Sequence, residues 1–279
     1  MNHKSKTFLT QAALIAACVS VTGLAHSQSN RAAITKTVAG PVTVRVKAIS
    51  ADFDVAVGKA KSIEVVVTNS NVSKVTVKKK GSAYKIGFGG QMLRSGRVTI
   101  RLPAGSGANI GVVSGDIKVK GIGGNVKLRT VSGDVKVSGA GNAEVLSVSG
   151  DVKLKKITGS VTAKTVSGDL HIESTGKANS KLVSSTTSGD LHWVGRCGKG
   201  CSMRLNTLSG RLQLSLDKAS SFKVSYSSFS GSFKDALGIK TSKSGRNQHG
   251  GRRLSGTYGS GAGKIKARSF SGKLKLKKK

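Results

Sequence analysis

The chain has 279 residues, including 37 Gly and only 2 Pro, and its 47 Lys and Arg against 12 Asp and Glu give a formal charge of +35. So much Gly predicts many tight turns, while an aromatic content of 4% disfavours base stacking and hence sequence-specific nucleic-acid binding. The positive charge favours contact with polyanions, or else only keeps a repetitive β-protein soluble and monomeric.

The N-terminus has the features of a secretory signal peptide over residues 1–27. A basic start precedes the apolar run Ala12–Val21, which is too short to span a bilayer, and small residues around Ala25 suit cleavage before Gln28. A second interpretation takes the residues up to Cys18 as a lipobox, which would acylate Cys18 and tether the protein to a membrane. Both interpretations predict export to the periplasm or the cell surface, and no later segment is long and apolar enough for a transmembrane helix.

Residues 28–103 are expected to form irregular strands that cap the rest of the chain. Segments such as Val42–Val46 and Val98–Leu102 alternate apolar and polar residues, as strands do. Extra residues between these segments suggest longer coils. A stack of repeats needs such a cap, because a bare end presents unpaired backbone groups.

Residues 104–279 repeat a short motif. Ser-Gly-Asp recurs with steps of 18, 17, 18 and 21 residues, and the fixed step predicts one coil per copy. Degenerate copies begin at Ser209, Ser230 and Ser271, and a weaker copy begins at Ser50. The complete copies are Ser114-Gly115-Asp116, Ser132-Gly133-Asp134, Ser149-Gly150-Asp151, Ser167-Gly168-Asp169 and Ser188-Gly189-Asp190.

Alternating residues on both sides of each turn predict two short strands per coil. Val126 and Leu128 alternate with Lys127 before one turn, and Val135 and Val137 follow it. One coil cannot bury its apolar side alone, but parallel stacking at about 4.8 Å would join these positions into a continuous core. The predicted fold is therefore all-β: a single parallel β-solenoid of about 17–21 residues per coil, capped by the irregular N-terminal strands.

The Ser-Gly-Asp turn has two interpretations. In the first, Gly supplies a positive φ or a close approach between coils, and the Ser and Asp side chains bond to turn amides. In the second, the column of Asp residues is a carboxylate ladder for Ca²⁺. Sparse Asp and abundant neighbouring Lys favour the first, and no metal or other cofactor is expected.

Cysteine usage fits export. If Cys18 leaves with the signal peptide, Cys197 and Cys201 remain as an even pair in an oxidising compartment, which predicts a disulfide. The CxxxC spacing without further Cys or His lacks the four ligands of a zinc site.

Two basic segments lie near the C-terminus. Residues 235–263 interrupt the repeat with Lys, Arg, Gly and Ser, and form either a binding loop or a disordered excursion. The tail Lys273–Lys279 alternates Lys and Leu before a run of Lys, and is expected to be a last strand that continues into a solvated basic end.

The repeated Ser-Gly-Asp units, each followed by alternating apolar residues, resemble the bacterial putative-adhesin family of β-solenoid domains, which is related to head-domain adhesin-like proteins. The strand Val98–Pro103 ahead of the first clear repeat is also similar, and the resemblance covers roughly residues 38–279. It implies the fold and an adhesin-like role, and carries no catalytic residues. This chain departs from the family in its strong basicity and in Arg211, Ser232 and Lys273 at the Asp position.

Cations at outward strand positions predict the function. We expect an exported, non-catalytic envelope or surface protein that binds or scaffolds anionic polymers such as lipopolysaccharide or acidic glycan, with only non-specific binding of nucleic acid. The candidate binding residues are Lys118, Lys136, Lys153, Lys127, Arg129, Lys164, Arg252 and Arg253.

Two other functions remain open: a β-helical polysaccharide-active enzyme, and self-association into a structural fibre. Catalysis on a polysaccharide needs a unique carboxylate cluster, whereas most Asp residues here are periodic and Glu is rare. His171 and His192 occupy the same position after the turn, which indicates outward ladder residues rather than a metal pair. No catalytic residue is therefore predicted.

Overall fold

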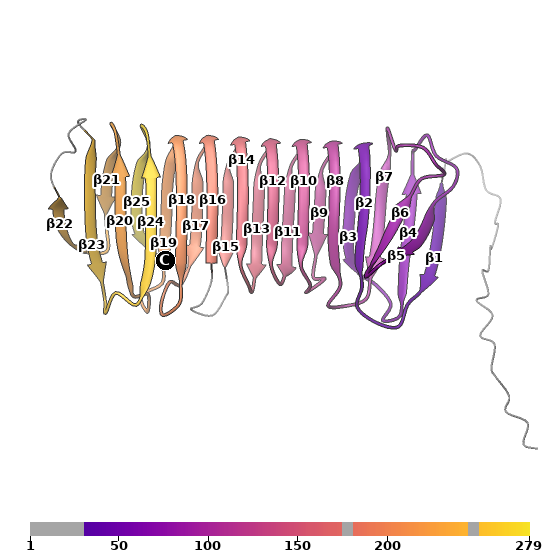
Figure 1. Cartoon of the computed structure of the whole chain (residues 1–279), viewed down its shortest axis with the longest axis horizontal. Helices are drawn as coiled ribbons and strands as arrows, with labels where there is room; N and C mark the ends of the chain where they lie inside the picture. The colour runs from indigo at the N-terminus through magenta and orange to yellow at the C-terminus, as the bar shows by residue number, and fades with distance from the viewer. Residues whose placement is uncertain (1–30, 175–180, 245–250) are drawn as a thin grey trace, which may run out of the picture.

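The computed structural model describes residues 31–174, 181–244 and 251–279. In these ranges the chain forms 25 strands in two sheets of 12 and 13 strands, called here sheet A and sheet B, which lie face to face along one axis (Figure 1). The described residues contain no helix that is long and apolar enough to cross a membrane. The expected signal peptide, with Cys18, lies outside them.

Each regular coil has a strand in sheet B, a Ser-Gly turn, a strand in sheet A and a corner that returns to sheet B. Ser132 pairs in parallel register with Ser114 on one side and Ser149 on the other, which confirms the predicted stacking. The regular coils are β8 (Gly107–Ser114) with β9 (Ile117–Lys120), β10 (Val126–Ser132) with β11 (Val135–Ala140), β12 (Ala143–Ser149) with β13 (Val152–Ile157), β14 (Val161–Ser167) with β15 (Leu170–Ser174), β16 (Lys181–Ser188) with β17 (Leu191–Gly195), and β18 (Ser202–Ser209) with β19 (Arg211–Leu216).

The core lies between the two sheets. Val126 and Leu128 on β10 are buried, as are Val135 and Val137 on β11, while Lys127 between the first two faces outward. The same positions of the other regular coils join one continuous apolar cluster, except that the buried Ser184 replaces an apolar residue on β16. Burying one Val or Leu side chain stabilises a protein by about 1.5–3 kcal/mol. Each added coil therefore stabilises the stack by burying apolar side chains that a single coil would leave exposed.

The turn requires Gly for two reasons. Gly168 has a φ of +128°, which side chains rarely adopt, and a Cβ there would lie 2.3 Å from the carbonyl oxygen of Gly150 in the preceding coil. The Gly of the other complete copies has a similarly positive φ. The first interpretation of the motif, a turn that lets successive coils approach closely, matches this geometry.

The N-terminal end contains one more regular coil and then an irregular cap. β2 (Thr43–Ser50) and β3 (Asp52–Val57) pair in parallel with β8 and β9, so the weak motif copy at Ser50 belongs to the stack. Antiparallel pairing appears beyond this coil. The cap strands are β1 (Ala32–Thr37), β4 (Ser62–Thr68) and β7 (Arg97–Leu102) in sheet A, and β5 (Thr76–Lys80) and β6 (Ala83–Gly87) in sheet B.

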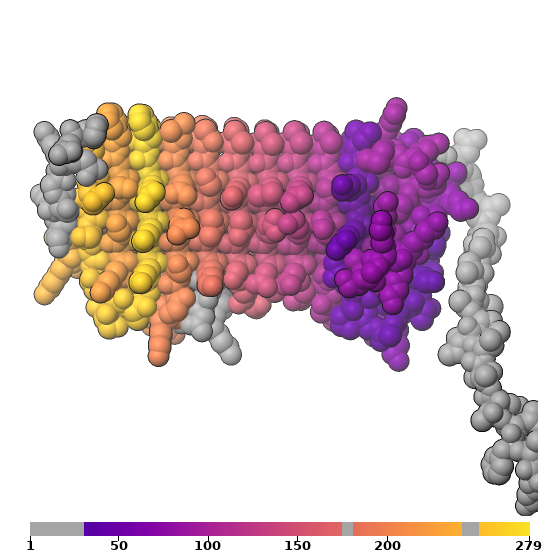
Figure 2. All heavy atoms as spheres, viewed as in Figure 1, coloured from indigo at the N-terminus to yellow at the C-terminus, as the bar shows by residue number. Residues whose placement is uncertain are grey.

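The last strands of the chain lie inside the stack, not at its end. β24 (Gly263–Ser269) and β25 (Lys273–Lys278) pair with β18 and β19 on one side, and with β20 (Phe222–Ser228) and β21 (Ser232–Asp235) on the other. The yellow band between orange strands in Figures 1 and 2 is this coil. The tail forms the last strand of the chain, as expected, but this strand lies in the interior of the stack. Repeats present equivalent apolar columns, such as Leu274 and Leu276, so chain order does not determine spatial order.

The described part of the basic insertion at 235–263 is a β-hairpin. β22 (Lys240–Ser244) pairs antiparallel with β23 (Arg252–Tyr258), which pairs antiparallel with β20. The ring of Tyr258 stacks on Phe222 at 5.5 Å between centroids. The hairpin thus caps sheet B at the C-terminal end, while residues 245–250, with Arg246, lie outside the described residues.

Candidate polyanion-binding surface

One row of cations crosses the outer face of sheet A. Lys118 on β9, Lys136 on β11 and Lys153 on β13 are partners in the parallel register. The buried Val135 and Val137 on either side of Lys136 turn its side chain outward. The structure therefore brings these three predicted residues together, at the strand spacing of about 4.8 Å.

The row continues along the stack beyond Lys153. His171 and His192 follow in register, with their rings edge to face at 5.0 Å between centroids. Asp54, the partner of Lys118 on β3, marks its N-terminal limit. We call the following eight residues, which span roughly 34 Å, the sheet A row: Lys118, Lys136, Lys153, His171, His192, Gln213, Lys275 and Lys234.

Crowding and burial lower the pKa of three groups in this row. Burial is the main cause of the lowered pKa of His171, followed by His192 and Lys153, and burial also lowers the pKa of His192. Lys277 is the main cause of the lowered pKa of Lys275. All three shifts favour the neutral form of the side chain, as expected where cations are close together.

Carboxylates neutralise little of the sheet A row. Lys136 Nζ lies 3.3 Å from Asp134 Oδ2, but both side chains are more than one third exposed. Exposed pairs of this kind contribute only about 0–1 kcal/mol, so a ligand can replace the partner. Within the described ranges, no ion pair involves Lys118 or Lys153.

Five predicted cations lie away from this row: Lys127, Arg129 and Lys164 on the outer face of sheet B, and Arg252 and Arg253 on the hairpin strand β23. Glu144 forms ion pairs with Lys127 and Arg129, with its Oε1 at 2.7 Å from Lys127 Nζ and 4.0 Å from Arg129 Nη2. These residues do not form one site with the sheet A row. Conversely, the sequence prediction missed Lys234, because its strand joins the row only through the displaced coil order.

The Asp residues of the turns bond to the backbone of the next coil. Asp134 Oδ1 accepts a hydrogen bond from the N–H of Asp151 at 3.1 Å, and Asp151 Oδ1 accepts one from Asp169 at 2.9 Å. Asp190 Oδ1 accepts a hydrogen bond from the N–H of Arg211 at 2.8 Å. Arg211 can end this series of hydrogen bonds because it contributes only its backbone N–H. The described residues contain no group of three or more His, Cys, Asp or Glu that could hold a metal ion. This geometry gives the Asp column a structural role.

Cys197 and Cys201 form a disulfide at the corner between β17 and β18. Their Cα atoms are 5.4 Å apart and both residues are buried. The carbonyl of Cys197 accepts a hydrogen bond from Ser221 N–H at 2.7 Å, and that of Cys201 accepts one from Lys264 N–H at 2.9 Å. The disulfide loop therefore lies where the displaced last coil enters the stack.

A row of exposed apolar side chains follows the turns of sheet B. Each occupies the position before the turn Ser, and Phe229 and Phe270 stack at 5.1 Å. The sequence signal was the apolar residue before nearly every turn Ser. The row carries no charge and lies outside the cationic surface; its members are Ile49, Val113, Val131, Val148, Val166, Leu208, Phe270 and Phe229.

The family model of the Toastrack DUF4097 domain matches residues 39–277. The chain belongs to this family. The match begins after β1 and covers the coils of the solenoid with the other cap strands, and it confirms the resemblance seen in the repeats.

One solved structure shows the same fold. A putative adhesin from Bacteroides fragilis NCTC 9343 is 14% identical, covers 88% of this chain and 96% of its own, and has a TM-score of 0.52. A putative adhesin from Parabacteroides distasonis ATCC 8503 is 10% identical over 88% of this chain and 96% of its own, with a TM-score of 0.42. A comparison with curated proteins found no match.

Proposed function

We propose that this Toastrack protein is an exported, non-catalytic envelope or surface protein that binds anionic polymers along the sheet A row. The polymer class is lipopolysaccharide or acidic glycan, and nucleic acid would bind only through its charge. The observation that carries the proposal is the register of Lys118, Lys136 and Lys153, which places a cation at the same position of three consecutive coils. A linear polyanion can follow such a row and release counterions at each step.

Three features support export and a surface role. The N-terminal sequence has the pattern of a secretory signal, and the Cys197–Cys201 disulfide suits an oxidising compartment. The similar structures carry the names of putative adhesins.

The ends of the stack favour a binding surface over a fibre assembled end to end. Antiparallel strands β1 and β4 extend sheet A at one end, and β22 and β23 extend sheet B at the other. Parallel stacking of one molecule on the next would have to displace these strands. Parallel end-to-end stacking could therefore involve sheet A only at the edge strand β21.

The test is binding of lipopolysaccharide and an acidic glycan to the mature protein, measured at about 0.05 M and 0.5 M salt. The triple variant K118Q/K136Q/K153Q removes three charges from the row. We expect it to bind about tenfold more weakly at low salt and to show a flatter salt dependence, because fewer counterions are released.

The matched control is K59Q/K199Q/K218Q, which removes three exposed charges outside the row. It should bind almost as well as the unchanged protein. An equal loss in both variants would mean that net charge alone attracts the polymer, and absence of binding at both salt concentrations would end the proposal. Turnover of the polysaccharide would instead favour an enzyme.

A further inference from the structure

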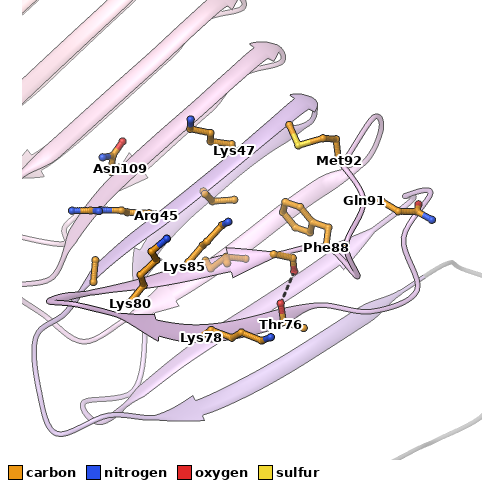
Figure 3. A pocket seen from close by; sticks show the side chains of 15 residues that line it. Arg45, Lys47, Thr76, Lys78, Lys80, Lys85, Phe88, Gln91, Met92 and Asn109 are labelled. Carbon is orange, nitrogen blue, oxygen red and sulfur yellow. Dashed lines mark hydrogen bonds between the residues drawn. The ribbon is translucent and has the colours of Figure 1, made fainter.

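A hollow of about 630 Å³ lies on the outer face of sheet B at the N-terminal end, between the β5–β6 hairpin and strands β2 and β8 (Figure 3). Buried Val46, Ile86 and Phe88 supply apolar lining, and the exposed Met92 stands at its edge. Five cations surround it: Arg45, Lys47, Lys78, Lys80 and Lys85. Clefts of this size and mixed lining are typical of small-molecule sites.

Three of these cations are direct neighbours across three strands. Arg45 on β2 pairs in register with Lys85 on β6, and Lys85 pairs with Lys78 on β5. Like charges directly opposite each other destabilise a sheet. The row therefore carries an unfavourable interaction that a bound anion would relieve.

Carboxylates do not compensate this cluster. None of the residues that line the hollow is an Asp or Glu. Within the part of the chain that the structure describes, none of the five cations forms an ion pair. On sheet B the next cations along the same row differ, since Lys127 has Glu144 as its partner.

The geometry determines the class of anion. At about 4.8 Å between strands, the row from Lys78 to Arg45 spans roughly 10 Å, so one carboxylate cannot reach all three groups. Phosphate offers up to two charges and several acceptor oxygens, which suits both Lys ammonium groups and the forked Arg guanidinium. The apolar lining suits the C–H face of a sugar ring.

We propose that the hollow binds a saccharide that carries at least two phosphate groups. Arg45, Lys78 and Lys85 contact the phosphates, and the sugar ring packs against the exposed Met92 at the edge of the hollow. This site is separate from the sheet A row, since it lies on the other sheet at the capped end. This proposal can therefore be tested independently of the proposed polymer binding.

The experiment is calorimetric titration of the mature protein with fructose 1,6-bisphosphate, with fructose and citrate as controls for the sugar and for charge alone. We expect the bisphosphate to bind at least about tenfold more tightly than citrate, and fructose not to bind. The variant R45Q/K85Q should lose about tenfold or more in affinity. Citrate that binds as tightly as the bisphosphate would overturn the assignment to phosphate.

A charge-matched variant controls for the net charge. K36Q/K79Q removes two exposed charges nearby that do not line the hollow, and Lys79 lies on the same hairpin strand as Lys78. Its affinity should equal that of the unchanged protein. Equal losses in both variants, or none in either, would refute the site. K118Q/K136Q/K153Q should keep full affinity, which separates this proposal from polymer binding.

A second measurement reports on folding without added ligand. Removing two of the three neighbouring cations should raise the thermal midpoint of R45Q/K85Q at low salt, and the gain should vanish at high salt. Unfolding of this variant would therefore contradict the argument from like charges. A folded R45Q/K85Q variant that still binds fructose 1,6-bisphosphate would contradict the proposed site.

Vesicles distinguish a free ligand from a lipid-anchored one. Phosphatidylcholine vesicles with and without lipid A, a diphosphorylated disaccharide lipid, are compared by sedimentation with the protein. Binding of lipid A vesicles that R45Q/K85Q loses and K36Q/K79Q keeps supports the site with a lipid-anchored headgroup. Binding of fructose 1,6-bisphosphate alone supports the site with a soluble ligand. If the protein binds neither the vesicles nor the bisphosphate, the site is refuted.

Discussion

The N–H of Asp151 donates a hydrogen bond to Oδ1 of Asp134, the equivalent residue one coil earlier, at 3.1 Å. The same contact recurs from Asp52 to Arg211, through every complete motif copy. Each carboxylate thus fixes the height of the next turn above its own. A Ca²⁺ ladder would need these oxygens as ligands, whereas here one oxygen of each is already a backbone acceptor.

Replacing Asp151 by Ala removes the acceptor for Asp169 N–H. We expect the D151A variant to lose about 1–2 kcal/mol of unfolding free energy, since hydrogen bonds to charged groups are worth about 1.5–3 kcal/mol and this one is exposed. D151N keeps an oxygen at the same place and should lose less than half as much. Urea denaturation measures both. Equal losses would show that the charge, not the acceptor, matters.

The Cys197–Cys201 disulfide restrains the corner where the last coil enters. Closing so short a loop contributes about 2 kcal/mol by the chain-entropy relation. The double variant C197A/C201A should lose about this much unfolding free energy under oxidising conditions. Added dithiothreitol should destabilise the unchanged protein by a similar amount and leave the variant unaffected, so sensitivity of the variant to reductant would contradict the prediction.

The two histidines of the sheet A row make stability depend on pH. Their folded pKa values lie below the ordinary 6.5, so between these values the unfolded chain binds more protons than the folded chain. The stabilising contribution is full above pH 6.5 and is lost as the pH falls through the folded values. Lys153, Lys155 and Glu173 are the other charges that act on His171.

The variant H171Q checks this dependence. Gln is a matched replacement, because Gln213 occupies the same row two coils further on. Urea midpoints at about pH 7.5 and pH 5 should fall less on acidification in H171Q than in the unchanged protein. A larger fall in H171Q would mean that the histidine proton stabilises the folded state.

Local repetition made most of the fold predictable. The Ser-Gly-Asp spacing and the alternation around Val126 and Leu128 determine coil length and inward faces, because a one-residue shift would turn Lys127 into the core. The sequence predicted the row at Lys118, Lys136 and Lys153 for the same reason. It could not predict Lys234 in that row or the cluster at Arg45, Lys78 and Lys85, because both arise from strands that pair out of chain order.

The position of the last coil gives the sharpest test of the architecture. β24 and β25 separate β18 and β19 from β20 and β21, so deleting residues 263–279 removes an interior coil rather than a loose tail. Phe222 and Tyr226 on β20 would lose their parallel partners, and Tyr226 Oη would lose the carbonyl of Gly272 at 2.7 Å.

Hydrogen exchange should show protection lost over β20 and β23 in this truncation, with the coils from β8 to β15 almost unchanged, because each coil depends on its neighbours. Deleting only residues 278–279 should leave the exchange pattern intact. If β20 and β23 kept their protection without the last coil, their order would not depend on pairing with β24, which would contradict this prediction.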